Sequence, residues 1–173
     1  MYLDLDHALF KIINGLAGRW ILLDGLGIFF ANYLIIGLGL FLLYLWFFKK
    51  INSRAVFSIF ISVAIVLLLN KLISVFYFRF RPFIAYPGVY QLVSQSLGNK
   101  SFPSDHTAVA FALATSSLFF NKRWGKWFLA GAFLIGLSRI FSGVHYPLDV
   151  VVGALLGAGT AVMIKWTIIG HST

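Results

Sequence analysis

The stretch AVFSIFISVAIVLLLNKLISVFYF, residues 55–78, decides the fold. Lys71 is its one charged side chain, and most of the other residues are aliphatic or aromatic. A helix needs about 20 consecutive, predominantly apolar residues to cross the hydrocarbon core of a bilayer. The length and character of this stretch therefore predict a transmembrane helix.

The composition of the whole chain also indicates a membrane protein. Hydrophobic residues make up 60% of its 173 residues and charged residues only 11%, far outside the range of soluble domains. The length predicts one domain over residues 1–173. The absence of cysteine excludes disulfides and thiol chemistry. The net charge of +9 does not indicate nucleic-acid binding, because no soluble basic face exists to hold a nucleic acid.

Five apolar stretches predict an all-α integral membrane bundle of about five transmembrane helices over residues 24–168. The predicted spans are residues 24–48, 55–78, 106–120, 127–142 and 147–168. The third and fourth are short for a full crossing.

Residues 1–19 predict an additional helix that lies on the membrane surface. Apolar side chains recur there at helical spacing, which is typical of an interfacial amphipathic helix. They are Leu5, Leu9, Ile12, Ile13 and Leu16. The segment lacks the basic start and unbroken apolar core of a signal peptide.

The basic residues predict the orientation of the bundle. With five spans, the basic connections 49–54 and 121–127 and the tail residue Lys165 fall on one side, which should be cytoplasmic by the positive-inside rule. The opposite side, with residues 79–105 and 142–147, should then be poor in cations. It nevertheless holds Arg79, Arg81, Lys100 and Arg139. Topology does not explain these four cations, whereas an anionic ligand does.

Three polar segments converge on that outer side: residues 70–83, 102–107 and 138–149. Arg81 and Arg139 carry planar guanidinium groups suited to bidentate phosphate binding. Ser104 follows a proline at a predicted helix N-cap, where free backbone N–H groups can hold an anion. The segments therefore predict a phosphate site.

The same segments supply groups for proton transfer and nucleophilic attack. His145 precedes Pro147, which suits the first turn of a helix, and Asp149 follows four residues after the histidine. From there the carboxylate can fix the tautomer of the imidazole and raise its nucleophilicity. With His106 as a second histidine, these groups predict metal-free phosphoryl transfer.

These motifs resemble the type 2 phosphatidic acid phosphatase superfamily over residues 70–153, in the order and spacing of that family. The wider sequence is most similar to the bacitracin-resistance branch of bacterial undecaprenyl-diphosphatases. The pattern is Arg81-Pro82, then Pro103-Ser104-x-His106, then Ser138-Arg139-x5-His145-x3-Asp149.

The resemblance implies a role for each matching residue. His145 would be the nucleophile that forms a phosphohistidine, Asp149 its relay, and His106 the general acid. The phosphate-binding residues would be Arg81, Ser104 and Arg139.

Two positions depart from the family pattern. Ser74 stands where the family has a lysine seven residues before the arginine of Arg-Pro. Lys71 lies three residues earlier and Arg79 just before Arg81, and both are further candidates for phosphate binding. Asp105 replaces a glycine of the superfamily, although the undecaprenyl-diphosphatase branch resembles this chain there. Its carboxylate must point away from phosphate or pair with a cation such as Arg79.

We therefore expect a membrane phosphatase that hydrolyses undecaprenyl diphosphate at the outer face of a bacterial inner membrane. No cofactor or metal is expected, because arginines and helix N-termini replace it. Phosphatidylglycerophosphate, phosphatidate and lipid A phosphates are alternative substrates, and a lipid-binding or lipid-transport relative is the non-enzymatic alternative. A zinc site of histidines and aspartates is opposed by the neighbouring arginines. A soluble vanadate haloperoxidase is excluded by hydropathy.

The segment 83–102 is semi-apolar and lies between two of the motifs. Val89, Leu92 and Val93 follow a turn at Tyr86-Pro87-Gly88. We expect them to dip into the membrane interface and form one wall of a lipid entrance.

Overall fold

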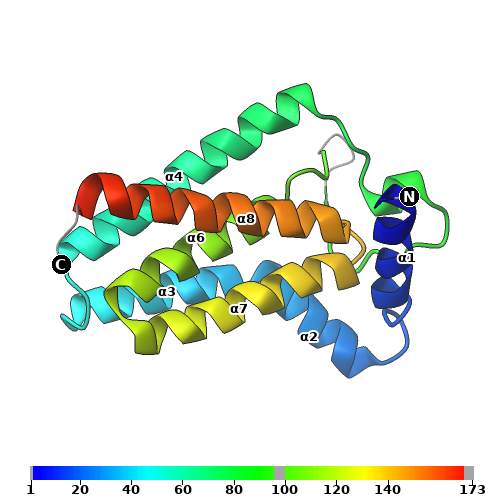
Figure 1. The fold of residues 1–173 in the computed structure, drawn as a ribbon. Helices are drawn as coiled ribbons and strands as arrows, with labels where there is room; N and C mark the ends of the chain where they lie inside the picture. Colours follow the sequence, from blue (N-terminus) through cyan, green and yellow to red (C-terminus); the bar gives the residue numbers. More distant parts are fainter. Residues whose placement is uncertain (1, 96–99, 170–173) are drawn as a thin grey trace.

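The computed structural model describes residues 2–95 and 100–169, and within these ranges the chain is helical and has no strand. The longer helices run along the length of a bundle (Figure 1). The α-helices are α1 Tyr2–Asn14, α2 Ile21–Asn32, α3 Leu34–Phe47, α4 Ser53–Phe76, α5 Pro82–Ala85, α6 Asp105–Phe120, α7 Lys122–Phe141 and α8 Pro147–Ile164. A π-helical turn, η1 Lys165–Ile169, continues α8.

The centre of the bundle is α6, which packs against α4, α7 and α8. Its contact with α8 brings backbone against backbone. A Cβ atom added to Gly157 would lie 2.2 Å from the carbonyl oxygen of Ala108, and one added to Gly153 would lie 2.7 Å from that of Ser104. Small residues at such crossings are typical of packed membrane helices. The close crossing holds the start of α6 beside the start of α8.

The outer surface of the bundle is apolar, as a membrane protein requires. Large hydrophobic side chains on its flanks face outward, with exposed fractions of 63% to 70%. They include Leu68, Phe133, Leu155 and Met163. The all-α membrane fold predicted from the sequence is confirmed.

Two helices are long and apolar enough to cross a bilayer, namely α4 and the helix Pro147–Thr167, within the described residues. The predicted span 24–48 is not one helix, because α2 and α3 meet at an angle of 53° and would form one broken span. A guanidinium nitrogen of Arg139 donates to the carbonyl oxygen of Ala31 at 3.2 Å, just before the break. A side chain that inserts into the helical hydrogen-bond ladder is a known cause of sharp bends.

The predicted third and fourth spans correspond to α6 and α7. With 16 residues, α6 is short, but its neighbours bury nine of its side chains, so it meets little lipid. α7 begins at Lys122, earlier than predicted, because the side chain of Asn121 accepts from the N–H groups of Arg123 and Trp124. The basic connection thereby becomes the first turn of α7. The number of five spans stays a prediction.

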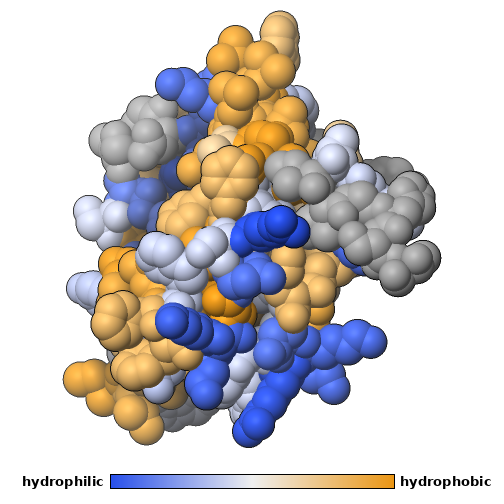
Figure 2. All heavy atoms as spheres, turned by 90° about the vertical axis from the view of Figure 1, so that its left-hand side faces the viewer, coloured by the Kyte–Doolittle hydropathy of each residue, from blue (hydrophilic) through white to orange (hydrophobic). Residues whose placement is uncertain are grey.

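The two ends of the bundle differ in character. At the basic end lie the α3–α4 connection, the α6–α7 connection and the end of α8 (Figure 1). Hydrophilic side chains gather across this end, with apolar side chains around them (Figure 2). Its cations are Lys49, Lys50, Arg54, Lys122, Arg123, Lys126 and Lys165. These basic connections lie together at one end of the bundle, as the sequence predicted.

The site end, with residues 79–95, 100–105 and 142–147, is crossed by α1 (Figure 1). Of the predicted apolar stripe, Leu5, Leu9, Ile12 and Leu16 are exposed, with Leu5 at 61% and Ile12 at 67%. Ile13 instead packs against a buried cluster that contains Phe10. The opposite face packs on the bundle and buries Asp6, Phe10 and Asn14. This helix therefore presents its apolar side to the membrane and a partly polar side to the protein.

Candidate active site

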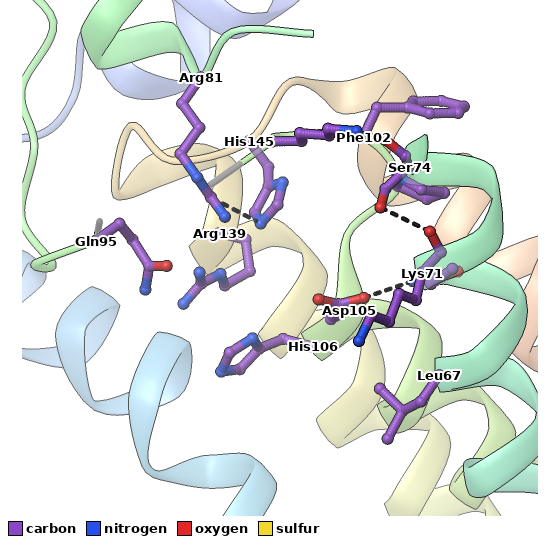
Figure 3. Close-up of a pocket in the computed structure, with 13 residues that line it drawn as sticks. Leu67, Lys71, Ser74, Arg81, Gln95, Phe102, Asp105, His106, Arg139 and His145 are labelled. Atoms are coloured by element: carbon purple, nitrogen blue, oxygen red, sulfur yellow. Dashed lines mark hydrogen bonds between the residues drawn. The ribbon is translucent and has the colours of Figure 1, made fainter. Parts of the chain in front are cut away.

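A cavity of about 620 Å³ opens at the site end between the end of α4, the start of α6 and the connections that precede α6 and α8. Arg81 enters it from the end of the bundle, and His106 and Lys71 enter from the helices below (Figure 3). The cavity is lined by Leu67, Asn70, Lys71, Ser74, Arg81, Gln95, Lys100, Phe102, Pro103, Asp105, His106, Arg139 and His145. Residues from all three predicted segments thus meet in one place.

The imidazole of His145 is held in one tautomer. Its Nδ1 atom lies 2.7 Å from the carbonyl oxygen of Ser101. A carbonyl can only accept, so Nδ1 carries the proton and donates it to this bond. Nε2 therefore keeps its lone pair, and it lies 3.3 Å from Nη1 of Arg81 (Figure 3). This unprotonated nitrogen is the one that can attack phosphorus.

The surroundings of His145 also favour the neutral ring. Burial, the largest effect, lowers the pKa of His145 to about 4. Asp149 opposes this shift in pKa, whereas the cations of Arg139 and Arg81 add to it. A neutral histidine is the nucleophilic form. The ring is thus poised for attack throughout the physiological pH range.

Asp149, which is fully buried, contacts His145 from the first turn of α8. Its Oδ2 atom lies 3.6 Å from Nδ1 of His145 and accepts from the N–H of Tyr146 at 2.8 Å. The nearest partner of Nδ1 is therefore the carbonyl of Ser101. The carboxylate acts on the ring mainly through its negative charge.

The two arginines of the cavity are buried, with Arg81 6% and Arg139 1% exposed. Each is fixed by a main-chain carbonyl. Nη1 of Arg81 donates to Val144 at 3.0 Å, and Nη1 of Arg139 donates to Ala31. Within the described part of the chain, Nε of Arg139 is buried without a hydrogen-bond partner. A buried donor of this kind is costly, and a phosphate oxygen would satisfy it.

Ser104 occupies the N-cap position of α6, as predicted, but its side chain does not line the cavity. Its buried hydroxyl accepts from Thr107 at 3.0 Å. Its own N–H group donates to the carbonyl of Asp149 at 3.1 Å. In the structure Ser104 thus joins the start of α6 to α8.

Arg79 and Asp105 do not pair with each other. Asp105 lines the cavity and accepts from the side-chain amide of Asn70 at 2.9 Å. The guanidinium of Arg79 lies outside the cavity lining, where it bridges Asp149 and Asp6. Lys71, the other additional candidate for phosphate binding, lines the cavity.

Several residues of this site were not singled out as site residues in the sequence. Asn70 is a buried polar residue in the apolar run 55–78, and this unusual position was an available signal. Lys100 was one of the four unexplained cations, and its ammonium group donates to the carbonyl of Ser74. Gln95 and the carbonyl of Ser101 left no signal in the sequence.

Of the predicted lipid-entrance wall, Val93 lies inside the protein, whereas Val89 and Leu92 are half-buried. Val93 is buried against Ala31 and Val144, and Val89 packs beside Phe10. Residues 96–99 of this segment lie outside the described residues.

Comparison with known proteins shows the family. The PAP2 superfamily matches residues 55–170, about two thirds of the chain. The chain belongs to the PAP2 superfamily. Membership confirms the resemblance seen in the motifs and makes the protein a membrane hydrolase of the lipid phosphatase class.

Two PAP2 relatives from Bacillus are similar over most of the chain. The undecaprenyl-diphosphatase BcrC of Bacillus subtilis is 37% identical over 155 residues, which cover 89% of this chain and 79% of that protein. The bacitracin transport permease protein BcrC of Bacillus licheniformis is 35% identical over 166 residues, covering 95% and 81%. The predicted similarity to the bacitracin-resistance branch is thereby confirmed.

A solved PAP2-like structure has the same fold. The crystal structure of LpxE from Aquifex aeolicus superposes with a TM-score of 0.75 at 32% sequence identity. The alignment covers 92% of this chain and 94% of that chain.

Proposed function

We propose that the protein hydrolyses undecaprenyl diphosphate to undecaprenyl phosphate and inorganic phosphate through a phosphohistidine on His145. The observation that carries this proposal is the unprotonated Nε2 of His145, which faces a cavity beside two buried arginines. The similarity to an undecaprenyl-diphosphatase supports the choice of lipid. The reaction would take place at the outer face of the bacterial inner membrane, where it would recycle the cell-wall lipid carrier.

In the first step, Nε2 of His145 attacks the terminal phosphorus. The bond from phosphorus to the bridging oxygen breaks, and His106 gives its proton to that leaving oxygen. Arg81 and Arg139 hold the equatorial oxygens as their charge redistributes. The carboxylate of Asp149 stabilises the positive charge that the ring acquires.

In the second step, water attacks the phosphohistidine. His106, now neutral, takes a proton from the water, and the electron pair of the P–N bond returns to Nε2. Inorganic phosphate leaves, and the starting protonation states are restored. Neither step needs a metal ion, because the two arginines supply the positive charge.

The cations of the cavity favour a diphosphate over a monoester. Lys71, Arg81, Lys100 and Arg139 line it together with one carboxylate, Asp105, an excess of three positive charges. When a diphosphate is cleaved, the leaving group is itself a phosphate and keeps negative charge. A monoester releases an uncharged alcohol. Lys71 and Lys100 lie beside Ser74 and are in place to hold the leaving phosphate.

An apolar groove lies about one helical turn along the bundle from the cavity and suits the hydrocarbon tail. It has a volume of about 350 Å³ and lies between α3, α4 and α6. On α4 its residue Val63 lies one turn before Leu67 of the cavity. On α6 its residue Val109 follows His106 by three positions. A headgroup in the cavity would thus leave its isoprenoid tail along the bundle, in contact with lipid.

The decisive test is phosphate release by the purified protein from several lipids, with His145→Ala alongside. We expect at least a tenfold preference for undecaprenyl diphosphate and a loss of about a thousandfold or more in the variant. A labelled phosphoenzyme that is absent in His145→Ala would support the intermediate. Equal activity of the variant would contradict the mechanism.

The other outcomes identify the alternatives. Faster turnover of phosphatidylglycerophosphate, phosphatidate or a lipid A phosphate would identify that lipid as the preferred substrate instead of undecaprenyl diphosphate. Lipid binding without any phosphate release would favour a lipid-binding or lipid-transport relative. Loss of activity with a chelator would favour a metal site.

The orientation has its own test, because the chain contains no cysteine. A cysteine at Tyr86 should react with an impermeant reagent in intact cells, and one at Lys126 only after lysis. Expression should also raise resistance to bacitracin, and an unchanged resistance would contradict that role.

A further inference from the structure

The helix α1 contributes a buried carboxylate to the site end. Asp6 is 6% exposed and lies on the face of α1 that packs on the bundle, together with Phe10 and Asn14. Its Oδ1 accepts from the N–H of Leu148 at 2.7 Å, in the first turn of α8. Its Oδ2 pairs with Nη2 of Arg79 at 2.5 Å. Both oxygens are therefore used, and both contacts reach segments more than seventy positions away.

Arg79 carries this contact on to Asp149. Its Nη1 donates to Oδ1 of Asp149 at 2.8 Å, and its guanidinium lies 3.7 Å from the ring centroid of Tyr146. The planar fork of an arginine can bridge two carboxylates in this way, whereas a lysine offers only a point charge. The stacking on Tyr146 fixes the plane of the fork.

The orientation of Asp149 depends on this bridge. One of its oxygens is held by Arg79 and the other by the N–H of Tyr146, so the carboxylate has a single position beside the ring of His145. Without Asp6, the fork of Arg79 would lose one of its two anchors, and a partly satisfied buried network is unstable. A shift of Asp149 would then change the charge felt by Nδ1 of His145.

We propose that Asp6 is a positioning residue for the phosphatase reaction, which acts through Arg79 to fix Asp149 against His145. The helix α1 is then part of the catalytic machinery as well as a membrane-surface helix. Arg79 acts as the bridge and does not bind the substrate phosphate. This inference rests on the proposed role of His145 as nucleophile but not on the identity of the lipid.

The test uses the full-length protein in lipid bilayers and Asp6→Asn, with the lipid phosphate that the wild type hydrolyses fastest. We expect kcat to fall about tenfold or more, the range found for residues that orient a functional group. KM and inhibition by inorganic phosphate should change less than twofold, because Arg81 and Arg139 are untouched. Asp6→Glu, which keeps the charge, should recover part of kcat.

Asp24→Asn is the matched control, since it makes the same chemical change near the same end of the chain. The carboxylate of Asp24 accepts from the N–H of Gly18 and does not line the cavity. We expect wild-type kinetics for this variant. A loss equal to that of Asp6→Asn would contradict the inference.

A double-variant cycle tests the route through Arg79. If Asp6 acts through this residue, Asp6→Asn combined with Arg79→Gln should be no slower than Arg79→Gln alone. If the losses of kcat in the two single variants multiplied in the double variant, the inference would be contradicted. Wild-type kcat in Asp6→Asn, or a loss of kcat together with weaker inhibition by phosphate, would contradict it as well.

If Asp6→Asn does not fold, Arg79→Lys tests the same link. It keeps one positive charge without the fork, so we expect a reduced kcat with an unchanged KM, and wild-type kcat would overturn the inference. A wild-type protein that releases no phosphate from any lipid would remove the proposed function, and this inference with it.

Discussion

Both ends of the bundle carry clusters of cations, but these cations differ in how far they are buried. At the basic end the cations are mostly exposed, and in the described residues none of them pairs with a carboxylate. At the site end Arg81 and Arg139 are buried and fixed by main-chain carbonyls. Exposed cations are solvated and cost little, whereas buried ones need a partner. Burial, more than charge, therefore distinguishes the arginines of the site end from the cations of the basic end.

The largest effect should follow from removing a buried cation. Arg139→Gln should lower kcat/KM by about 10²- to 10³-fold, because it removes a preorganised donor to the transferring phosphoryl group. Arg123→Gln, the same change at the basic end, should leave kcat/KM within twofold. Steady-state kinetics on one lipid substrate measure both, and similar losses in the two variants would break the comparison.

The pH profile should show the effect of burial on the site end. Because the pKa of His145 is about 4 in the folded protein, the neutral ring persists from pH 7 to pH 5. We expect kcat/KM to begin to fall only near pH 4, where His145 becomes protonated. Below that pH it should fall about tenfold for each pH unit. A fall of kcat/KM centred near pH 6.5 would indicate an ordinary exposed histidine.

The same depressed pKa affects stability, with a definite sign. Between the unfolded value of 6.5 and about 4, the unfolded chain binds a proton that the folded protein does not. The contribution of His145 to the free energy of unfolding is therefore complete above pH 6.5 and falls as the pH drops to 4. His145→Gln should show a weaker acid destabilisation in this window.

A smaller effect is expected for a cation at the edge of the cavity. Lys71→Gln should lower turnover of a lipid diphosphate about tenfold and leave turnover of a lipid monoester nearly unchanged, because only the diphosphate has a charged leaving group. Lys50→Gln at the basic end is the control. Equal losses on both substrates would show that Lys71 does not contact the leaving phosphate.

The smallest effect should come from the basic end itself. Replacing Lys122, Arg123 and Lys126 together by glutamine should change kcat by less than twofold, because the start of α7 lies at the opposite end of the bundle from the site end (Figure 1). The change should appear as a larger fraction of inverted molecules, since such residues set orientation. Protease accessibility in sealed vesicles measures that fraction.

The sequence allowed the membrane fold to be predicted, and it showed which candidate residues meet in the cavity, because both depend on local patterns. The apolar run 55–78 predicted α4, and the motif spacing brought His145 and Asp149 to the start of one helix. The bend between α2 and α3 was not predictable, and the side chain that contacts α2 beside it, Arg139, lies more than a hundred positions away.

The same physical reason hid Asp6 from sequence analysis. The apolar side chains in residues 1–19 indicated a surface helix. The sequence did not show which residues the polar side chains of this helix, such as Asp6, would contact. The contacts of Asp6 lie on Arg79 and Leu148, and only the folded chain brings them together. Ser104 is a different case. Its N-cap position on α6 was predicted, but the hydrogen bond from its N–H group to Asp149 in α8 was not.

The carbonyls that hold His145, Arg81 and Arg139 belong to Ser101, Val144 and Ala31. Because every amino acid has a carbonyl, these positions can accept many replacements that fit their space without losing the hydrogen bond. Adding or deleting one residue next to them would move the acceptor away from its donor. We therefore expect the three positions to tolerate point substitutions better than insertions or deletions of a single residue.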